Sequence, residues 1–282
     1  MTVSAKGMRG IFTNIKSTIY FFSGTGNSLA TARRIGSALE PQAEILSMAK
    51  LYYDSDIRSD SEVIGFVFPI FMGDAPWVVK EFVKKINIVG SPYIFAVATC
   101  NDNPGKCLPI FRELWKRHSQ TLSLGEIVSM PGSGKISSPE ENEERLRASA
   151  ERSIAVAQKV NRREKGTGEP GVGLSGKKVA GSPRKKLDIA FTRFKVSALC
   201  DGCGICRRIC PMGNVELENK KPIWNRHCAA CLACFHWCPQ KAITFRLPIL
   251  GNRPRYRHPD ITIKDIAAQQ PSHRAGGKNP LR

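Results

Sequence analysis

The chain has 282 residues, 41% of them hydrophobic, and a formal net charge of +19. This length is enough for two folded domains, and the hydrophobic content excludes an intrinsically disordered protein. No apolar run approaches the roughly 18–20 residues of a membrane-spanning helix, and no signal peptide is recognisable. We therefore expect a soluble, cytoplasmic protein without a membrane span.

Residues 17–160 alternate short apolar runs with amphipathic segments, which predicts a parallel sheet covered by helices. Strands are expected at 17–22, 43–46, 63–68, 93–99 and 124–130. Helices are expected at 29–39, 78–86, 108–117 and from 139 to about 160. The last helix has a capping box, with Ser138 as the N-cap, Pro139 as the first residue and Glu141 at the third position.

The turn between the first strand and the first helix is rich in glycine and hydroxyl residues. It consists of Ser23, Gly24, Thr25, Gly26, Asn27 and Ser28. Backbone N–H groups, neutral side-chain donors and a helix N-terminus can together hold a phosphate without Lys or Arg. The turn lacks the Gly-Lys-Ser/Thr of a Walker A loop, and Leu29 stands where a dinucleotide loop needs a third glycine. The alternative is an ordinary turn.

Two further loops follow strands whose carboxyl ends lie at the same edge of the predicted sheet. The loop after the third strand contains Phe71, Met72, Gly73 and Asp74. The loop after the fourth strand contains Thr99, Cys100, Asn101 and Asp102. Ligands of open α/β sheets bind at this edge, at the switch point between strands one and three. We therefore expect all three loops to form one binding site, although Met72-Gly73-Asp74 also fits an ordinary tight turn.

The phosphate loop and the strand pattern over residues 17–160 resemble those of flavodoxins. The resemblance implies a flavodoxin-like, doubly wound α/β parallel sheet that binds FMN. Met72-Gly73-Asp74 resembles the Met-Gly-Asp turn of some short-chain flavodoxins, where the glycine peptide flips and its carbonyl accepts a hydrogen bond from reduced flavin N5. Unlike many flavodoxins, the fourth-strand loop has no Trp or Tyr, so Phe71 or Trp77 is expected to cover the flavin.

Eight of the ten cysteines follow one spacing, C-x2-C-x2-C-x3-C-P, used twice. The first repeat contains Cys200, Cys203, Cys206 and Cys210, and the second contains Cys228, Cys231, Cys234 and Cys238. This spacing is typical of 4Fe–4S clusters, in which the fourth ligand of each cluster comes from the other repeat. A zinc site would leave half of the thiols unused, and disulfides would need an oxidising compartment. We therefore assign Cys200, Cys203, Cys206 and Cys238 to one cluster and Cys228, Cys231, Cys234 and Cys210 to the other.

The remaining segments separate and flank these two parts. Residues 161–186 are basic and rich in glycine, which indicates a mobile linker. Residues 187–246 form the predicted cluster domain, with a short helix at 187–194 and short strands at 215–217 and 242–245. Residues 247–282 form a basic tail that either wraps the cluster domain or stays disordered. Cys100 and Cys107 lie outside the repeats and are expected to be inert thiols.

The cluster domain resembles a small α+β two-cluster bacterial ferredoxin. The two halves in this order resemble the flavodoxin–ferredoxin fusion proteins of anaerobic bacteria and archaea. The resemblance implies an electron-transfer iron–sulfur flavoprotein that contains FMN and two 4Fe–4S clusters, with no catalytic residue assigned. Two alternatives stay open: an FMN-dependent reductase of a quinone or flavin, and an iron–sulfur redox sensor that binds nucleic acid.

The positive charge is concentrated in the second half of the chain. Residues 166–282 contain 21 Lys and Arg against 7 Asp and Glu, whereas residues 1–165 contain 22 against 17. A basic surface of this kind can steer an acidic redox partner protein toward the clusters. It could also bind nucleic acid or an anionic membrane surface, or act only in solubility. No nucleic-acid-reading motif is present, so we expect the acidic redox partner.

Overall fold

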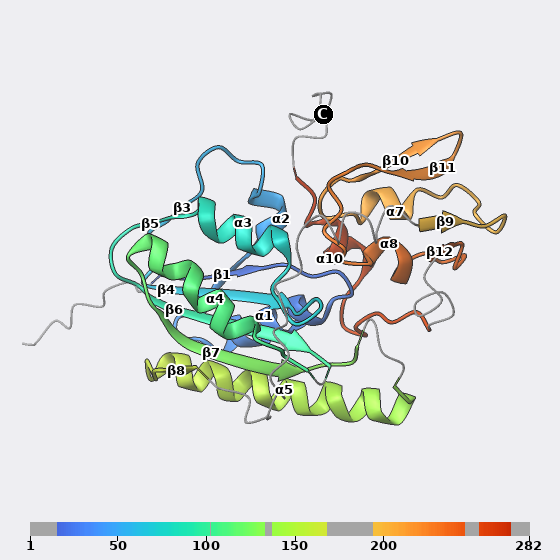
Figure 1. The fold of residues 1–282 in the computed structure, drawn as a ribbon. Helices are drawn as coiled ribbons and strands as arrows, with labels where there is room; N and C mark the ends of the chain where they lie inside the picture. The colour runs from blue at the N-terminus through green and yellow to red at the C-terminus, as the bar shows by residue number, and fades with distance from the viewer. Residues whose placement is uncertain (1–15, 102, 133–136, 168–193, 246–253, 272–282) are drawn as a thin grey trace, which may run out of the picture.

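The computed structural model describes residues 16–101, 103–132, 137–167, 194–245 and 254–271. The first three ranges form an α/β unit, and residues 194–245 form a smaller cysteine-rich unit beside it (Figure 1). The last range, from the predicted tail, lies between the two and contacts both.

The α/β unit is built on a six-stranded parallel sheet in the order β2-β1-β4-β6-β7-β8. The strands are β1 (Ser17–Phe21), β2 (Glu44–Ser47), β4 (Val63–Pro69), β6 (Tyr93–Cys100), β7 (Leu122–Ser129) and β8 (Gly166–Thr167). The first five have the 2-1-3-4-5 order of flavodoxin-like sheets, with the switch point at β1 and β4. The five predicted strands are confirmed, each within two residues. β8 was missed, and it lies in the segment predicted as linker.

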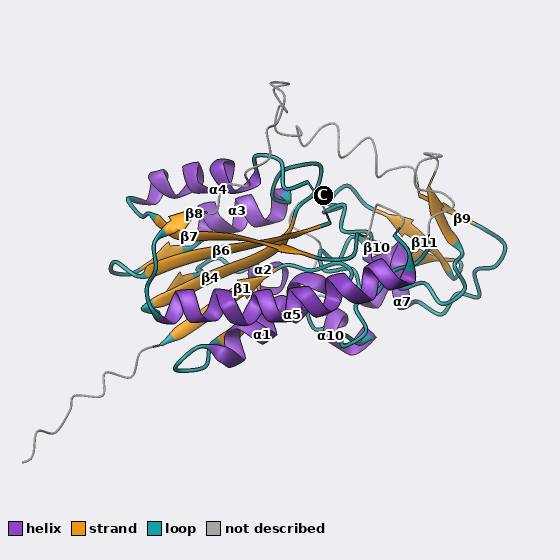
Figure 2. Cartoon of the chain, turned by 90° about the horizontal axis from the view of Figure 1, so that it is seen from below, coloured by secondary structure: helices purple, strands orange, loops and turns teal. Residues whose placement is uncertain are grey.

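Helices cover both faces of the sheet (Figure 2). On one face lie α1 (Asn27–Ala38) and α5 (Pro139–Asn161), and on the other lie α3 (Trp77–Lys85) and α4 (Cys107–Trp115). The four predicted helices are confirmed, and the capping box of α5 is present, with the Glu141 N–H donating to the Ser138 hydroxyl. Short elements that the sequence did not predict are α2 (Met48–Leu51), η1 (Lys116–His118), and the paired strands β3 (Arg58–Ser59) and β5 (Asn87–Ile88).

Alternating side chains of the strands fill two apolar cores. Ile19 and Val67 pack with the helices α1 and α5, whereas Tyr20, Phe66 and Phe68 pack with α3 and α4. Because side chains of a strand alternate between faces, burial on both sides fixes the register of each strand. The carboxyl ends of β1, β4 and β6 are thereby held in line, and the three loops predicted to form the site start from them.

The cysteine-rich unit consists of short elements around two cysteine-bearing loops. They are β9 (Phe194–Val196), α7 (Ile205–Arg208), β10 (Val215–Glu218), β11 (Lys221–Trp224), α8 (Ala233–His236) and β12 (Ile243–Phe245). The two predicted strands correspond to β10 and β12, but their antiparallel partners β11 and β9 were missed. The helix predicted at 187–194 lies outside the described residues except for Phe194, which starts β9 instead.

The described part of the tail, residues 254–271, runs back along the α/β unit. It contains α10 (Ile263–Ala267), which starts with a capping box at Thr262. Ion pairs join it to α1: Arg33 to Asp265 at 2.5 Å and Arg34 to Asp260 at 2.6 Å. The tail was expected either to wrap the cluster domain or to stay disordered. Its described residues pack against the cluster unit and also against the α/β unit. Among the described residues, no helix is both long and apolar enough to cross a membrane.

Candidate cofactor site

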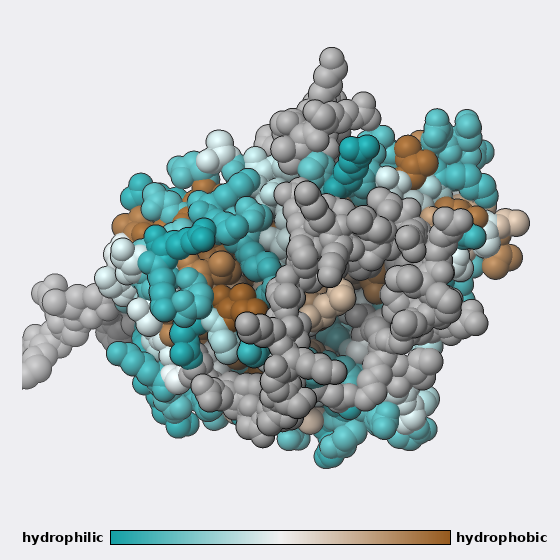
Figure 3. Space-filling view, viewed as in Figure 1, coloured by the Kyte–Doolittle hydropathy of each residue, from teal (hydrophilic) through white to brown (hydrophobic). Residues whose placement is uncertain are grey.

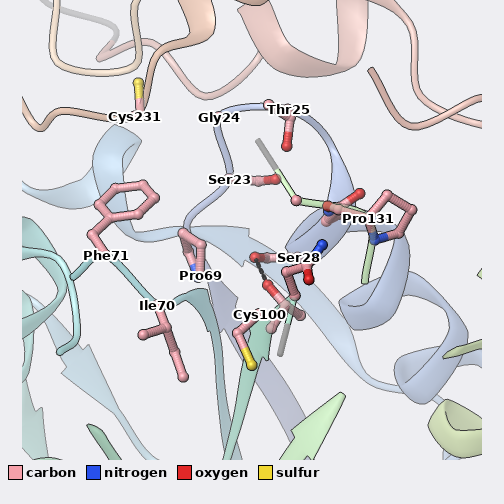
Figure 4. Close-up of a pocket in the computed structure, with 14 residues that line it drawn as sticks. Ser23, Gly24, Thr25, Ser28, Pro69, Ile70, Phe71, Cys100, Pro131 and Cys231 are labelled. Carbon is pink, nitrogen blue, oxygen red and sulfur yellow. Dashed lines mark hydrogen bonds between the residues drawn. The ribbon is translucent and has the colours of Figure 1, made fainter. Parts of the chain in front are cut away.

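A cavity of about 230 Å³ lies at the carboxyl edge of the sheet, where the three predicted loops meet (Figure 4). Its wall consists of Ser23, Gly24, Thr25, Asn27, Ser28, Pro69, Ile70, Phe71, Thr99, Cys100, Asn101, Pro131, Gly132 and Cys231. Nine of these residues were predicted as flavin-site residues from the sequence. Pro131 and Gly132 were missed, although their position after the fifth strand places them at the same edge. Cys231 comes from the cysteine-rich unit.

The predicted phosphate loop is a tight turn between β1 and α1. The Gly26 N–H donates to the Ser23 hydroxyl at 3.2 Å, which closes the turn. Gly26 has a φ of 104° and is not part of the cavity wall. A Cβ on this residue would lie 2.9 Å from the Cβ atoms of His258 and Ile261. Only glycine combines this backbone angle with this close packing. Figure 4 shows the Thr25 side chain directed toward the cavity.

Several polar side chains of the loop are held by protein partners. The Ser28 and Thr99 hydroxyls lie 2.8 Å apart and join the loop to the end of β6. The Asn27 amide donates to the Pro131 carbonyl at 2.9 Å and accepts from the Tyr256 hydroxyl at 2.7 Å. The loop is therefore ordered by its neighbours before any ligand binds, which lowers the entropic cost of binding a phosphate.

The loop after β4 forms a turn beside the cavity. Phe71 and Asp74 exchange backbone hydrogen bonds of 2.9 and 3.2 Å, and Met72 and Gly73 between them both have positive φ, as in a type I′ turn. Phe71 lies in the cavity wall, but Met72, Gly73 and Asp74 do not. The buried Asp74 carboxylate accepts from the Ala75 N–H at 2.7 Å and from Lys80 at 2.6 Å. Asp74 therefore stabilises the turn.

Of the two aromatic residues expected to cover the flavin, Phe71 lies in the cavity wall. The Trp77 indole is instead buried between the units, where it donates to the Cys228 carbonyl at 3.0 Å. Thr99, Cys100 and Asn101 line the cavity, and Asp102 lies outside the described residues. Cys107 is buried below this edge, and burial raises the pKa of its thiol, which therefore stays protonated.

The eight cysteines of the repeats divide into the two predicted groups. Cys200, Cys203, Cys206 and Cys238 together line a second cavity. In the other group, burial raises the pKa of Cys231 and Cys234, and the neighbouring sulfurs of Cys210 and Cys228 raise it further. The last cysteine of each repeat, Cys210 or Cys238, thus lies in the group formed by the other repeat. This exchange is the ligand pattern of two-cluster ferredoxins.

The donor set of both groups fits iron–sulfur clusters. Sulfurs receive backbone hydrogen bonds, from Asn214 to Cys210 at 3.2 Å and from Ala230 to Cys228 at 3.4 Å. Burial also raises the pKa of Cys206, to about 11. Buried thiols with raised pKa values ionise only beside a positive charge, which iron would supply.

Among the described residues, no three His, Cys, Asp or Glu side chains converge closely enough to hold a single metal ion.

The second cysteine group lies directly against the phosphate loop. A Cβ on Gly24 would stand 2.1 Å from the Cys231 carbonyl oxygen, so only glycine fits at this contact. The Trp237 indole donates to the Gly24 carbonyl at 2.9 Å. The sequence analysis assigned no site role to the tail or to Trp237, because no local pattern encodes a contact between distant segments.

Residues 199–243 match the family of 4Fe-4S dicluster domains. No curated protein matches the chain. The α/β unit is similar to solved structures of an azoreductase from Bacillus anthracis str. Sterne (12% identity, 51% of this chain and 100% of that chain, TM-score 0.36) and of flavodoxin from Megasphaera elsdenii in its two-electron reduced state (18%, 48% and 98%, 0.31). A flavodoxin from Streptococcus pneumoniae TIGR4 is also similar (17%, 50% and 97%, 0.32).

Proposed function

We propose that this chain, which joins a flavodoxin-like α/β domain to a 4Fe–4S dicluster domain, is an electron-transfer iron–sulfur flavoprotein. The observation that carries the proposal is the position of Cys231. This residue is a cluster ligand in the two-cluster pattern, and it also forms part of the wall of the cavity at the phosphate loop. A cofactor in the cavity and a cluster on Cys231 would therefore be neighbours.

The residues around the cavity support FMN as its cofactor. The phosphate would be held by the loop from Ser23 to Ser28 at the N-terminus of α1, where backbone N–H groups and the helix dipole favour an anion. The flavin ring would lie among Phe71, Thr99, Cys100 and Asn101. The two cysteine groups would each hold one 4Fe–4S cluster. Eight cysteines used as cluster ligands rather than as disulfides fit a reducing compartment, in line with the proposed cytoplasmic location.

The two clusters differ in their access to solvent, which suggests an order of transfer. Cys203 is exposed, whereas Cys234 is buried and Cys231 borders the flavin cavity. Electrons would therefore pass between a partner protein and the Cys203 cluster, then the Cys231 cluster, and then FMN. Each cluster carries one electron, and full reduction of FMN takes two electrons and two protons. Two successive electrons and two protons from solvent would complete one reduction.

The surface around Cys203 fits an acidic partner protein. Arg207, Arg208, Lys220 and Lys221 are exposed around this cysteine group, and Lys221 also donates to the Cys200 carbonyl. Leu199 is 66% exposed and Ile223 38% exposed. Figure 3 shows hydrophobic residues as separate spots among hydrophilic ones at the end of the unit that carries β9, β10 and β11. The four basic side chains outnumber the exposed Asp201 and Glu218 in this region, and with the apolar residues they favour an acidic protein docked at this cluster.

Anaerobic purification of the full chain tests the proposal. Iron, sulfide and flavin are counted per chain, and a stepwise reductive titration is followed by absorbance and EPR. The proposal predicts about eight irons and about one FMN per chain, with both kinds of cofactor reduced in the titration. Iron without FMN, even after FMN is added in excess, would contradict the flavin assignment. Rapid multiple turnover with a quinone or free flavin would favour the reductase alternative.

A further inference from the structure

The described tail, residues 254–271, contacts both cofactor sites, and we call it the C-terminal clasp. It lies outside the segment that matches the dicluster family, which ends at residue 243. Its side chains reach the phosphate loop on one side and the cysteine-bearing loops on the other. It contributes no residue to the wall of the flavin cavity. Any effect of the clasp on a cofactor would therefore act through the loops that it holds.

On the flavin side, the clasp holds the phosphate loop by its backbone. The Gln269 side chain is fully buried, with its Oε1 accepting from the Ser23 N–H at 3.1 Å and its Nε2 donating to the Ser23 carbonyl at 2.9 Å. The His258 N–H donates to the Thr25 carbonyl at 2.9 Å. These bonds satisfy backbone groups that a free loop would leave to water, so they fix the backbone course of the loop.

On the cluster side, Gln270, the residue that follows Gln269, holds the cysteine-rich unit. The Gln270 Nε2 donates to the Cys210 carbonyl at 3.0 Å and to the Arg207 carbonyl at 2.5 Å. Cys210 belongs to the same cysteine group as Cys231. Arg255, at the start of the clasp, donates to the Lys241 and Ile243 carbonyls at 2.9 and 2.6 Å. Two consecutive glutamines thus join the phosphate loop to the backbone of a cluster ligand.

We propose that Gln269 and Gln270 are positioning residues that hold the phosphate loop in its binding conformation and fix it against the Cys231 cluster. The inference rests on the proposed function, because it assigns the loop to FMN phosphate. Gln269 preorganises the loop, and preorganisation increases affinity by removing an ordering cost at the moment of binding. Gln270 ties the loop to the backbone of a cluster ligand. The distance between the flavin and the cluster is therefore set by the protein and not only by how the flavin binds.

The test compares the full-length wild type with Gln269→Met, which keeps the side-chain length and removes both hydrogen bonds. Lys264→Ala, at an exposed position on α10, is the matched control. FMN affinity is measured by fluorescence titration of the flavin-free, cluster-loaded chain. Loss of two buried hydrogen bonds predicts binding that is about 10- to 100-fold weaker in Q269M and unchanged in K264A. The iron content of both variants stays at the wild-type value.

Amide hydrogen exchange of residues 23–28 in the flavin-free chain provides an independent readout. The inference predicts faster exchange at Ser23 in Q269M and wild-type exchange in K264A. Gln270→Met is expected to keep FMN affinity within about twofold and to slow the reduction of bound flavin by the reduced clusters. Wild-type affinity and wild-type exchange in Q269M would overturn the inference, as would unchanged flavin reduction in Q270M.

Two further comparisons keep the test decisive. If Q269M loses iron, Gln269→Asn replaces it, because this variant keeps a neutral amide but draws it back by one methylene from the Ser23 backbone groups. An affinity between those of wild type and complete loss is then expected, and wild-type affinity would contradict the inference. If the wild type itself binds no flavin, the proposed function fails, and the exchange comparison in flavin-free protein still decides whether the clasp orders the loop.

Discussion

The backbone of Gly24 lies against the backbone of Cys231, so closely that a Cβ on Gly24 would stand 2.1 Å from the Cys231 carbonyl oxygen. Gly24 belongs to the phosphate loop of the α/β unit, and Cys231 belongs to the second cysteine group. The contact places the two candidate cofactor sites side by side within one chain. The contact also requires glycine at position 24 because a larger residue would overlap Cys231, which is a reason unrelated to phosphate binding.

Gly24→Ala is expected to separate the loop from the second cysteine group. The added methyl group overlaps a backbone oxygen, so one of the two loops must shift, at a typical cost of about 1–3 kcal/mol. We expect FMN affinity to fall at least about tenfold, because the loop loses its binding conformation. Fluorescence titration with FMN measures this change.

A glycine outside the contact provides the control for this substitution. Gly90 has a φ of 77° with open space around it, and asparagine tolerates this angle well. Gly90→Asn is therefore expected to bind FMN like the wild type. Equal affinities in the G24A and wild-type proteins would show that the contact has no role in the site.

Trp237→Phe is expected to weaken the same interface from the other side. The substitution removes the hydrogen bond from the buried indole to the Gly24 carbonyl and leaves that carbonyl unpaired. The cost of such a loss is about 1–3 kcal/mol. We expect weaker FMN binding with unchanged iron content, measured on the same samples. Loss of iron with intact FMN binding would instead assign Trp237 to the cluster alone.

Substitution of single cysteines separates the two clusters. Cys231→Ala removes a ligand of the buried group and Cys203→Ala one of the exposed group, so each is expected to lower iron from about eight to about four per chain. EPR of the reduced variants identifies the remaining cluster. C231A is expected to keep reduction of the Cys203 cluster by an external donor and to lose transfer to FMN. Rapid flavin reduction in C231A would contradict the proposed order.

The amino-acid sequence predicted five strands of the main sheet, the main helices and the cysteine groups, because each depends on local periodicity or fixed spacing. Apolar runs such as 63–68 and the cap at Ser138 are local signals, and the structure confirms both. β8 was missed because Gly166 and Thr167 carry no strand pattern, and pairing with β7 creates the strand. β9 and β11 were missed for the same reason, since each depends on its antiparallel partner.

Contacts between distant segments were outside the reach of sequence reasoning. The pairing of Gln269 with Ser23 spans 246 positions, and a glutamine in a basic tail has no pattern that points to a backbone partner. Met72, Gly73 and Asp74 were assigned to the flavin from the position of their loop and from its resemblance to the Met-Gly-Asp turn of some short-chain flavodoxins. The structure places them beside the cavity, because the Asp74 carboxylate turns inward to its own turn and to Lys80. Their direct contact with flavin stays a prediction.

The C-terminal clasp is expected to loosen as the pH falls. Burial and, to a smaller extent, the nearby Arg34 lower the pKa of His258 to about 4, against the opposing effect of Asp260. Between the ordinary value of 6.5 and about 4, the detached clasp binds a proton that the attached clasp does not. Opening is therefore favoured as pH decreases through this window, by at most about tenfold per pH unit.

Amide hydrogen exchange of residues 254–271 at pH 7 and pH 5 measures this opening. His258→Gln removes the titrating group and is expected to flatten the pH dependence, with iron content measured at each pH as the control. Desolvation raises the pKa of Asp265, but hydrogen bonds from Thr262 and Arg33 outweigh it and lower the pKa to about 2, so its ion pair persists at pH 5. An identical pH dependence in H258Q would exclude His258 as the cause.

Charge reversal near Cys203 tests the docking surface. Arg208→Glu changes an exposed basic residue beside the exposed cysteine group. With an acidic electron-transfer protein as the partner, the association rate is expected to fall about tenfold at low salt and to lose part of its salt dependence. Stopped-flow mixing measures the rate. Lys116→Glu, at the opposite edge of the sheet, is the control, and equal effects of both reversals would indicate only a net-charge effect.

An anaerobic crystal structure of the full chain with FMN bound, with iron located by anomalous scattering, tests the central claim most directly. The account predicts one cluster on Cys200, Cys203, Cys206 and Cys238, and another on Cys210, Cys228, Cys231 and Cys234. It places the FMN phosphate on the loop from Ser23 to Ser28, with the cavity wall at Cys231 shared between the flavin and the second cluster. A flavin bound elsewhere, or an iron-free Cys231 thiol beside the flavin, would contradict it.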